Sequence, residues 1–250
     1  MINEKQQQVE VPVFVALDFA HAHEARELVQ KLGEHHSHYK IGLQLYLAAG
    51  RAFVSELESE GKSIFLDLKF HDIPNTVHFA VAEAAKLGVD FVTIHAGGGK
   101  EMMKSAVEAA HHHSLPQHQT KVLAVTLLTS LHVNDLVQLG YMTTDLVKQV
   151  QRLTYLAQDC NVHGVVCSAH EVAAVKASTG LKTMVPGIRT SGDAKGDQAR
   201  VATPEYAVQC GADYLVVGRP ITQAANPVQA LQELKALISG SQHETGEMNV

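Results

Sequence analysis

The sequence feature that most constrains the fold is a regular alternation of short apolar, β-rich runs with amphipathic helical segments. Eight runs have the composition of buried strands: Val13–Asp18, Tyr39–Gln44, Ser63–Phe70, Phe91–Ala96, Lys121–Leu128, Gly164–Ser168, Lys182–Ile188 and Tyr214–Arg219. Helical patterns follow them over His23–Glu34, Leu47–Glu60, Pro74–Leu87, Lys100–His112, Thr143–Cys160, Ala169–Ser178, Pro204–Cys210 and Pro227–Ser239, with a short extra helix over Val133–Leu139. Eight strand–helix units predict an α/β fold, a single-domain (β/α)8 TIM barrel.

A doubly wound open sheet is the second possibility for such an alternation. That fold binds dinucleotides through a glycine-rich turn after its first strand, whereas this chain has Asp18-Phe19-Ala20 there. No linker or shift in composition divides the 250 residues, a length that suits one large α/β barrel. We therefore expect the barrel over residues 12–239, between polar tails at 1–11 and 240–250.

Charge and composition exclude several function classes. The 20 basic and 26 acidic residues give a net charge of −6, and no basic block is present, so nucleic acid is not an expected partner. Apolar runs such as Tyr214–Val217 are too short to cross a membrane. The polar Met1–Glu10 has no apolar core of a signal peptide, which favours the cytoplasm. Cys160, Cys167 and Cys210 are scattered, as expected for reduced thiols.

The third strand ends in a cluster of charges. Asp67, Lys69 and Asp72 fall within six residues, and Pro74 starts the next helix. Alternate strand residues share a face, so Asp67 and Lys69 point the same way, roughly 6–7 Å apart along the backbone. A surface ion-pair cluster would be the ordinary explanation. However, the strand itself is apolar, with Ile64, Phe65, Leu66 and Leu68. Charges on an interior strand need a functional reason.

Other polar residues also occupy the carboxyl ends of the predicted strands, where barrels of this kind place their catalytic groups. These residues are Asp18, Lys40, Asp67, Lys69, Asp72, Thr129, Arg189 and Arg219. After strands seven and eight, the sequences Val185-Pro-Gly-Ile-Arg189 and Val217-Gly-Arg-Pro-Ile221 indicate a phosphate site. Their glycines allow close backbone approach to an anion, and their arginines supply forked donors.

Lys40, Asp67, Lys69 and Asp72 alternate in sign, which favours protonated lysines beside ionised aspartates. A protonated lysine in that setting is a credible acid. Asp18, Asp67 and Asp72 could in principle hold Mg²⁺, although the interleaved lysines already neutralise them. No serine or cysteine lies beside a base in the manner of a nucleophile.

The motif Asp67-Leu-Lys-Phe-His-Asp-Ile-Pro-Asn-Thr-Val77 resembles that of the orotidine 5′-phosphate decarboxylase family, of the bacterial type. The resemblance covers nearly the whole barrel, through Val13-Phe-Val-Ala-Leu-Asp18, Tyr39-Lys-Ile-Gly42, Thr126-Leu-Leu-Thr-Ser130, Val185-Pro-Gly-Ile-Arg-Thr190 and Asp213-Tyr-Leu-Val-Val-Gly-Arg-Pro220. It implies a carboxy-lyase that converts orotidine 5′-monophosphate to UMP and carbon dioxide, the last step of UMP biosynthesis, with no metal and no organic cofactor.

The resemblance also implies roles for the catalytic residues. Lys69 would protonate C6 of the pyrimidine as carbon dioxide leaves, and Asp67 would lie against the substrate carboxylate. Lys40 and Asp18 would link this network to the ribose hydroxyls. Asp72, with its neighbours Ile73 and Thr76, would reach into the neighbouring subunit's site, so the enzyme would be a homodimer with shared active sites.

For the rest of the substrate, the resemblance implies that Thr129 meets the pyrimidine and that Pro186 also contacts the substrate. Gln198, on the long Thr190–Ala202 loop, would bridge base and phosphate. Arg189, Gly218 and Arg219 would hold the phosphate.

Three alternatives stay open on the residues alone. An Mg²⁺-dependent sugar-phosphate decarboxylase or aldolase shares the shorter Asp-x-Lys-x-x-Asp pattern. A non-catalytic phosphate-binding barrel would keep the fold without needing Lys69. A Schiff-base aldolase would use the same lysine as a nucleophile, which flanking aspartates disfavour.

Overall fold

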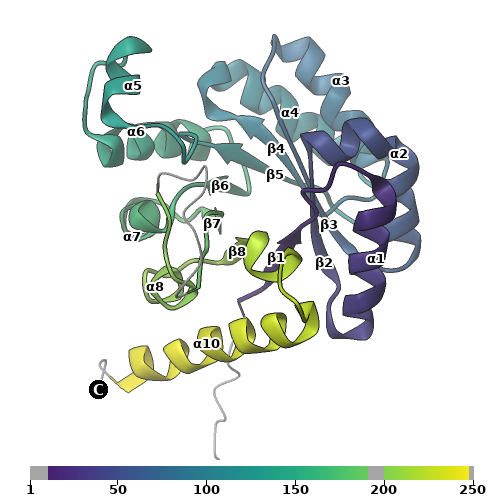
Figure 1. Ribbon diagram of the computed structural model, residues 1–250. Helices are drawn as coiled ribbons and strands as arrows, with labels where there is room; N and C mark the ends of the chain where they lie inside the picture. Colours follow the sequence, from purple (N-terminus) through teal and green to yellow (C-terminus); the bar gives the residue numbers. More distant parts are fainter. Residues whose placement is uncertain (1–10, 191–199, 248–250) are drawn as a thin grey trace, which may run out of the picture.

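The barrel is closed and entirely parallel. A computed structural model describes residues 11–190 and 200–247, apart from the side chains of 242–247, and its strands form one ring in sequence order (Figure 1). The strands are β1 (Val13–Ala16), β2 (His38–Gly42), β3 (Ser63–Phe70), β4 (Phe91–His95), β5 (Lys121–Val125), β6 (Gly164–Val166), β7 (Lys182–Val185) and β8 (Tyr214–Val217). β8 pairs with β1 and closes the ring. The predicted single-domain (β/α)8 barrel is confirmed.

Helices surround the ring and return the chain from each strand to the next. They are α1 (Ala22–Leu32), α2 (Leu43–Ser59), α3 (Pro74–Ala85), α4 (Gly99–His113), α5 (Val133–Gln138), α6 (Leu146–Gln158), α7 (Ala169–Ser178), α8 (Pro204–Gln209), α9 (Arg219–Thr222) and α10 (Pro227–Glu247). Two 3₁₀ turns, Gly33–His35 and Ala96–Gly98, complete the connections. Across the described helices, none is both long enough and apolar enough to span a membrane.

Several element ends differ from the sequence prediction. Asp18, Leu128 and Ile188 lie beyond the ends of their strands, because pairing stops at the rim while the apolar pattern runs on. Arg219 begins the unpredicted helix α9 instead of ending a strand. α10 continues past its expected end at Ser239, since a single glycine at position 240 costs a helix only about 1 kcal/mol.

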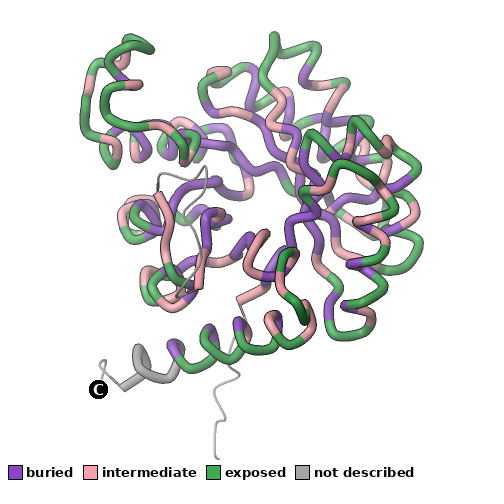
Figure 2. The backbone as a smooth tube through the Cα atoms, viewed as in Figure 1, coloured by how far each residue is buried: buried purple, intermediate pink, exposed green. Residues whose placement is uncertain are grey.

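Aromatic side chains fill the inside of the barrel. Phe14, Phe65 and Phe91 meet edge to face, with ring centroids 5.7–6.3 Å apart. All three are buried. Figure 2 shows burial along the backbone, with buried strands at the centre and exposed outer faces on the helices. The inside of the barrel is therefore packed with side chains at this level.

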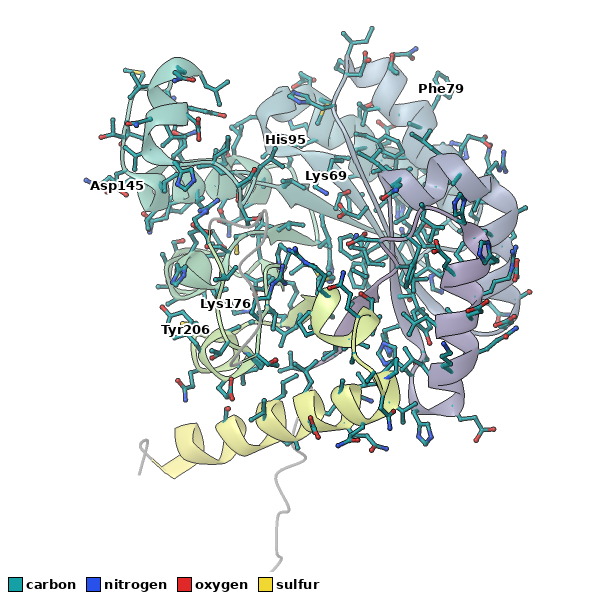
Figure 3. All side chains as sticks on the ribbon, in the orientation of Figure 1. Lys69, Phe79, His95, Asp145, Lys176 and Tyr206 are labelled. Atoms are coloured by element: carbon teal, nitrogen blue, oxygen red, sulfur yellow. The ribbon has the colours of Figure 1, made fainter. Side chains whose placement is uncertain are left out.

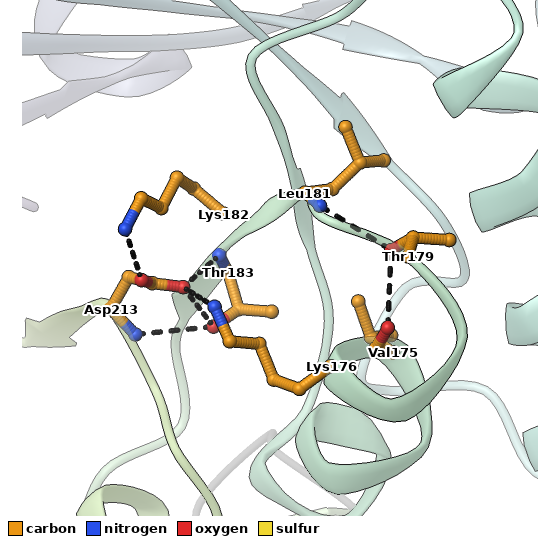
Figure 4. A network of polar contacts seen from close by, with 7 residues as sticks. All are labelled: Val175, Lys176, Thr179, Leu181, Lys182, Thr183 and Asp213. Carbon is orange, nitrogen blue, oxygen red and sulfur yellow. Dashed lines mark hydrogen bonds and ion pairs between the residues drawn. The ribbon is translucent and has the colours of Figure 1, made fainter.

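A largely shielded carboxylate, 14% exposed, ties β7 to β8. Asp213, just before β8, accepts hydrogen bonds from the Thr183 backbone N–H (2.9 Å) and hydroxyl (3.1 Å) (Figure 4). It also pairs with Lys176 Nζ at 2.7 Å and Lys182 Nζ at 2.8 Å. Burial alone would raise the pKa of Asp213, but the hydrogen bonds from Lys176, Lys182 and Thr183 outweigh it and lower that pKa.

Replacing Asp213 with asparagine is expected to lower the free energy of unfolding by about 1–3 kcal/mol at neutral pH, because two lysines lose a largely shielded, charged partner. The folded-state pKa lies below the unfolded value of about 3.9, so this stabilisation is complete above that pH. It is lost as the pH falls through the lowered folded pKa. Urea unfolding at pH 7 and at pH 3 should therefore show a difference between variant and parent that shrinks in acid.

The matched control is Asp159→Asn. Asp159 pairs with Lys100 at 2.6 Å, but both side chains are about half exposed, at 59% and 46%. Its loss should leave the unfolding free energy unchanged within error, since exposed ion pairs contribute little. Equal destabilisation by the two substitutions would show that burial of the Asp213 network has no special effect.

Candidate active site

A cavity of about 580 Å³ opens at the carboxyl ends of the strands. Its floor is apolar and is shared with the aromatic core, through residues such as Phe65, Val125 and Val216. Nine of the sequence-predicted site residues line it: Asp18, Lys40, Asp67, Lys69, Thr129, Pro186, Arg189, Gly218 and Arg219. Side chains that are far apart in sequence are thus brought to one end of the barrel.

Four charged side chains form a chain across β1, β2 and β3. Lys40 Nζ lies 2.9 Å from Asp18 Oδ1 and 3.8 Å from Asp67 Oδ2. Lys69 Nζ lies 2.8 Å from each carboxylate oxygen of Asp67. The order Asp18–Lys40–Asp67–Lys69 therefore alternates in sign, as the sequence predicted for its members Lys40, Asp67 and Lys69.

Asp67 is well shielded, with its side chain 12% exposed, close to the 10% of its neighbour Lys40. Its Oδ1 also accepts a hydrogen bond from the hydroxyl of Thr93, at 3.0 Å. Burial alone would raise the pKa of Asp67, but the charges of Lys40 and Lys69 and the hydrogen bonds from Lys69 and Thr93 outweigh it and lower that pKa. Asp67 is thus an ionised carboxylate held between two ammonium groups.

The backbone at Lys69 is unusual. Its φ is 50°, in the left-handed region that favours glycine. The register with β4 shifts at the same place, since Leu66 pairs with Val92 but Phe70 pairs with Ile94. The Lys69 N–H donates to Thr93 Oγ1 at 2.8 Å, which fixes this irregularity. Irregular strand geometry of this kind redirects a side chain, and here it brings the ammonium group onto Asp67.

Two residues that support the charge chain were missed from the sequence. Thr93 lies in an apolar strand, where a threonine is an ordinary β-branched residue. The alternation of side chains along that strand could have indicated that its hydroxyl faces the site. Gly42 ends β2, and a Cβ there would lie 3.1 Å from Lys40 Nζ and 3.3 Å from Asp18 Oδ1. A larger residue at position 42 would therefore press on the Lys40–Asp18 pair.

The opposite wall of the cavity comes from the loops after β5, β7 and β8. Thr129 and Ser130 follow β5, while Pro186, Gly187 and Arg189 follow β7. Gly187 has a φ of 79°, which a side chain would strain. With Arg219 at the start of α9, two guanidinium groups line the same cavity as the charge chain. This pair suits a doubly charged anion such as a phosphate.

The remaining predicted residues do not line this cavity. Asp72, Ile73 and Thr76 are exposed, and Ile73 is 66% exposed. Asp72 Oδ1 accepts a hydrogen bond from the Ile73 N–H at 2.7 Å. Gln198 lies outside the described residues. The role of the first three in a partner's site stays a prediction.

A stacked histidine pair lies beside the site. The rings of His71 and His95 have centroids 5.0 Å apart and planes 12° apart, and Figure 3 places His95 and Lys69 near one another at the same end of the barrel. His95 Nδ1 accepts a hydrogen bond from the Gly97 N–H, at 3.2 Å. Burial and the nearby His71 and Lys69 lower the pKa of His95, so its ring is neutral. His95 is thus a neutral, hydrogen-bonded histidine at the edge of the site.

The site combines an apolar floor, a buried carboxylate between two lysines, and a pair of arginines. These features suit a partly flat, anionic ligand with a phosphate at one end. Within residues 11–190 and 200–247, no three His, Cys, Asp or Glu side chains are placed to hold a metal ion.

Comparisons with known proteins agree with this geometry. Residues 12–234 match the model of the "Orotidine 5′-phosphate decarboxylase / HUMPS family". An orotidine 5′-phosphate decarboxylase of Escherichia fergusonii is 44% identical over 92% of this chain and 93% of that protein. One of Pectobacterium carotovorum subsp. carotovorum is 43% identical over 96% and 97%. A crystal structure of the Lactobacillus acidophilus orotidine 5′-phosphate decarboxylase, 36% identical, superposes with a TM-score of 0.82 over 91% of this chain and 98% of that one.

Proposed function

Because this chain belongs to the orotidine 5′-phosphate decarboxylase / HUMPS family, we propose that its cavity converts orotidine 5′-monophosphate to UMP and carbon dioxide. The chain is then a carboxy-lyase acting at the last step of UMP biosynthesis. The observation that carries the proposal is the charge chain, in which Asp67 is held by Lys40 and by Lys69 at the mouth of an apolar-floored cavity.

Decarboxylation leaves an electron pair on carbon, so the site must stabilise a carbanion-like centre. An ammonium group fixed at that carbon supplies electrostatic stabilisation without solvent reorganisation. Lys69 is such a group, and it protonates C6 as carbon dioxide departs. Asp67 faces the substrate carboxylate, where the repulsion between two anions is relieved as the carboxylate leaves. Lys40 and Asp18 contact the ribose hydroxyls and keep Asp67 in place.

The arginine end of the cavity holds the substrate phosphate. Arg189, Arg219 and the backbone at Gly218 bind it, while Thr129 and Pro186 contact the base. Gln198, which lies outside the described residues, bridges base and phosphate. Binding energy gained at the phosphate can contribute to the chemical step, because it holds the base against Lys69.

The active form is a homodimer with shared sites, in which Asp72, Ile73 and Thr76 complete the cavity of the partner subunit. Their exposure on a lone chain supports this proposal. So do the large apolar side chains exposed on α2 and α3, Leu47 at 82% and Phe79 at 60%. The reaction takes place in the cytoplasm, where the chain's free cysteines stay reduced.

An absorbance assay for orotidine 5′-monophosphate tests the function directly. We expect rapid loss of the substrate with formation of UMP, and a rate changed by less than about twofold after exhaustive chelation, because the charge chain supplies the electrostatics itself. Loss of activity on chelation would favour the Mg²⁺-dependent sugar-phosphate enzymes. Absence of any turnover would favour a non-catalytic phosphate-binding barrel.

A further inference from the structure

Arg200 connects the loop after β5, the helix α7 and the loop after β7. Its guanidinium pairs through Nη1 with the carboxylate of Glu171 on α7. Through Nη2 it donates to the carbonyl oxygen of Leu128, at 3.0 Å, and approaches that of Leu127, at 3.5 Å. Leu127 and Leu128 line the cavity next to Thr129. One side chain thus fixes the loop after β5.

The backbone beside Arg200 is fixed to a different wall. Ala202 O accepts from the Arg189 N–H at 2.9 Å, and the Ala202 N–H donates to Gly187 O at 3.3 Å. Ile188 and Ala202 form a parallel bridge. Residues 200–202 are therefore an extension of the β7 loop, the wall that carries Arg189. Arg200 spans from this wall to the β5 loop.

The ion pair is well shielded. The Arg200 side chain is 11% exposed and that of Glu171 is 3% exposed. Glu171 is itself held, because its Oε2 accepts from the Ser168 N–H at 2.6 Å at the start of α7. Buried ion pairs often add no net stability compared with apolar residues of similar size. Their strict geometry makes them better suited to fixing the relative placement of two segments.

We propose that Arg200 is a positioning residue that sets the spacing between the β5 wall and the β7 wall of the cavity. The proposal rests on the proposed function, in which the β5 wall contacts the pyrimidine and the β7 wall holds the phosphate of the same nucleotide. Arg200 then determines whether a ligand held by its phosphate presents its base correctly to Lys69. The position of the base relative to Lys69 affects turnover, because even a small displacement of a reacting group lowers the reaction rate strongly.

The planar guanidinium is essential to this role. Its Nη1 group pairs with the Glu171 carboxylate, while its Nη2 group donates a hydrogen bond to the Leu128 carbonyl oxygen. A lysine carries a single ammonium centre and cannot keep both contacts in a fixed plane. Arg200→Lys therefore retains the charge but removes the rigid connection between the walls.

The test compares kcat/KM for orotidine 5′-monophosphate with kcat/KM for orotidine, which lacks the phosphate. In Arg200→Lys, we expect the first to fall at least about tenfold and the second by less than about threefold, because only the nucleotide uses both walls at once. A variant that is merely less stable has fewer active molecules, so both values would fall by the same factor. Equal falls would overturn the proposal.

Two further variants test whether the selective loss comes from the Arg200 contacts and not from misfolding or from any Arg→Lys change. Arg200→Met combined with Glu171→Met removes the ion pair without leaving a buried charge, so it should fold while showing the same selective loss on the nucleotide. Arg26→Lys is the matched control, since Arg26 makes a similar two-pronged pair with Glu56 at 2.6 and 2.7 Å on the outside of the barrel. It should change neither substrate's kcat/KM. A folded double variant with unchanged selectivity would contradict the positioning role.

If the unsubstituted protein does not turn over orotidine 5′-monophosphate at all, the function is wrong. If it does, and the ratio of the two kcat/KM values is unaffected in both Arg200 variants, only the positioning role is wrong.

Discussion

Replacing Lys69 with alanine is expected to lower kcat by at least about 10⁵-fold, combining the usual contributions of a proton donor and of a preorganised charge. The ammonium group is both the proton source and the main positive charge at the reacting carbon, and no other described side chain can take its place. Asp67 keeps its contacts with Lys40 and Thr93. The barrel should therefore remain folded.

The measurement is steady-state loss of orotidine 5′-monophosphate, with circular dichroism and thermal unfolding on the same samples. Lys86→Ala is the control, since Lys86 forms an exposed pair with Glu83 on the outside of the barrel and should leave kcat unchanged. A folded Lys69→Ala variant with more than about 1% of the parent activity would be incompatible with its role as the acid. Borohydride trapping of a substrate adduct on Lys69 would point instead to Schiff-base chemistry.

Mixing inactive Lys69→Ala and Asp72→Ala subunits is expected to restore activity, to about a quarter of the parent value in an equal mixture. Random pairing makes half of the dimers mixed. In each mixed dimer one shared site carries both substitutions and the other carries neither. Activity should appear at the rate of subunit exchange, followed with differently tagged subunits by mass spectrometry.

Lys69→Ala mixed with Asp67→Ala is the matched control. Both residues lie in the cavity of their own chain, so every site in that mixed dimer keeps one lesion and no activity should return. If Lys69→Ala and Asp72→Ala subunits exchange freely and remain inactive, the shared site is wrong and Asp72 acts only within its own subunit.

The alternation of strands and helices could be predicted from the sequence, because buried parallel strands are continuous apolar runs and the helices between them are amphipathic. The same logic located Asp18, Lys40, Asp67 and Lys69, since charges at the end of an interior strand stand out. The predicted strands extend too far at their carboxyl ends, as at Asp18. At that point the chain changes from a paired strand to a rim loop, which alters its hydrogen bonding but not its hydrophobicity.

The residues that sequence reasoning missed act through geometry that composition does not encode. Thr93 looks like any strand threonine, and only the register of β3 against β4 brings its hydroxyl to Asp67. Arg200 lies in a segment without periodicity, and its partners Glu171 and Leu128 are distant in sequence. Gly42 resembles an ordinary strand-to-helix glycine until the Lys40–Asp18 pair is seen beside it.

The left-handed backbone at Lys69 has a consequence for how this barrel can change over time. A φ of 50° suits glycine or asparagine, and holding a lysine there costs about 1–3 kcal/mol. Selection for stability alone would thus replace the very residue on which the chemistry depends. Lysine at this position persists only while turnover is under selection, so its identity in a relative of this fold reports whether that relative still needs its acid.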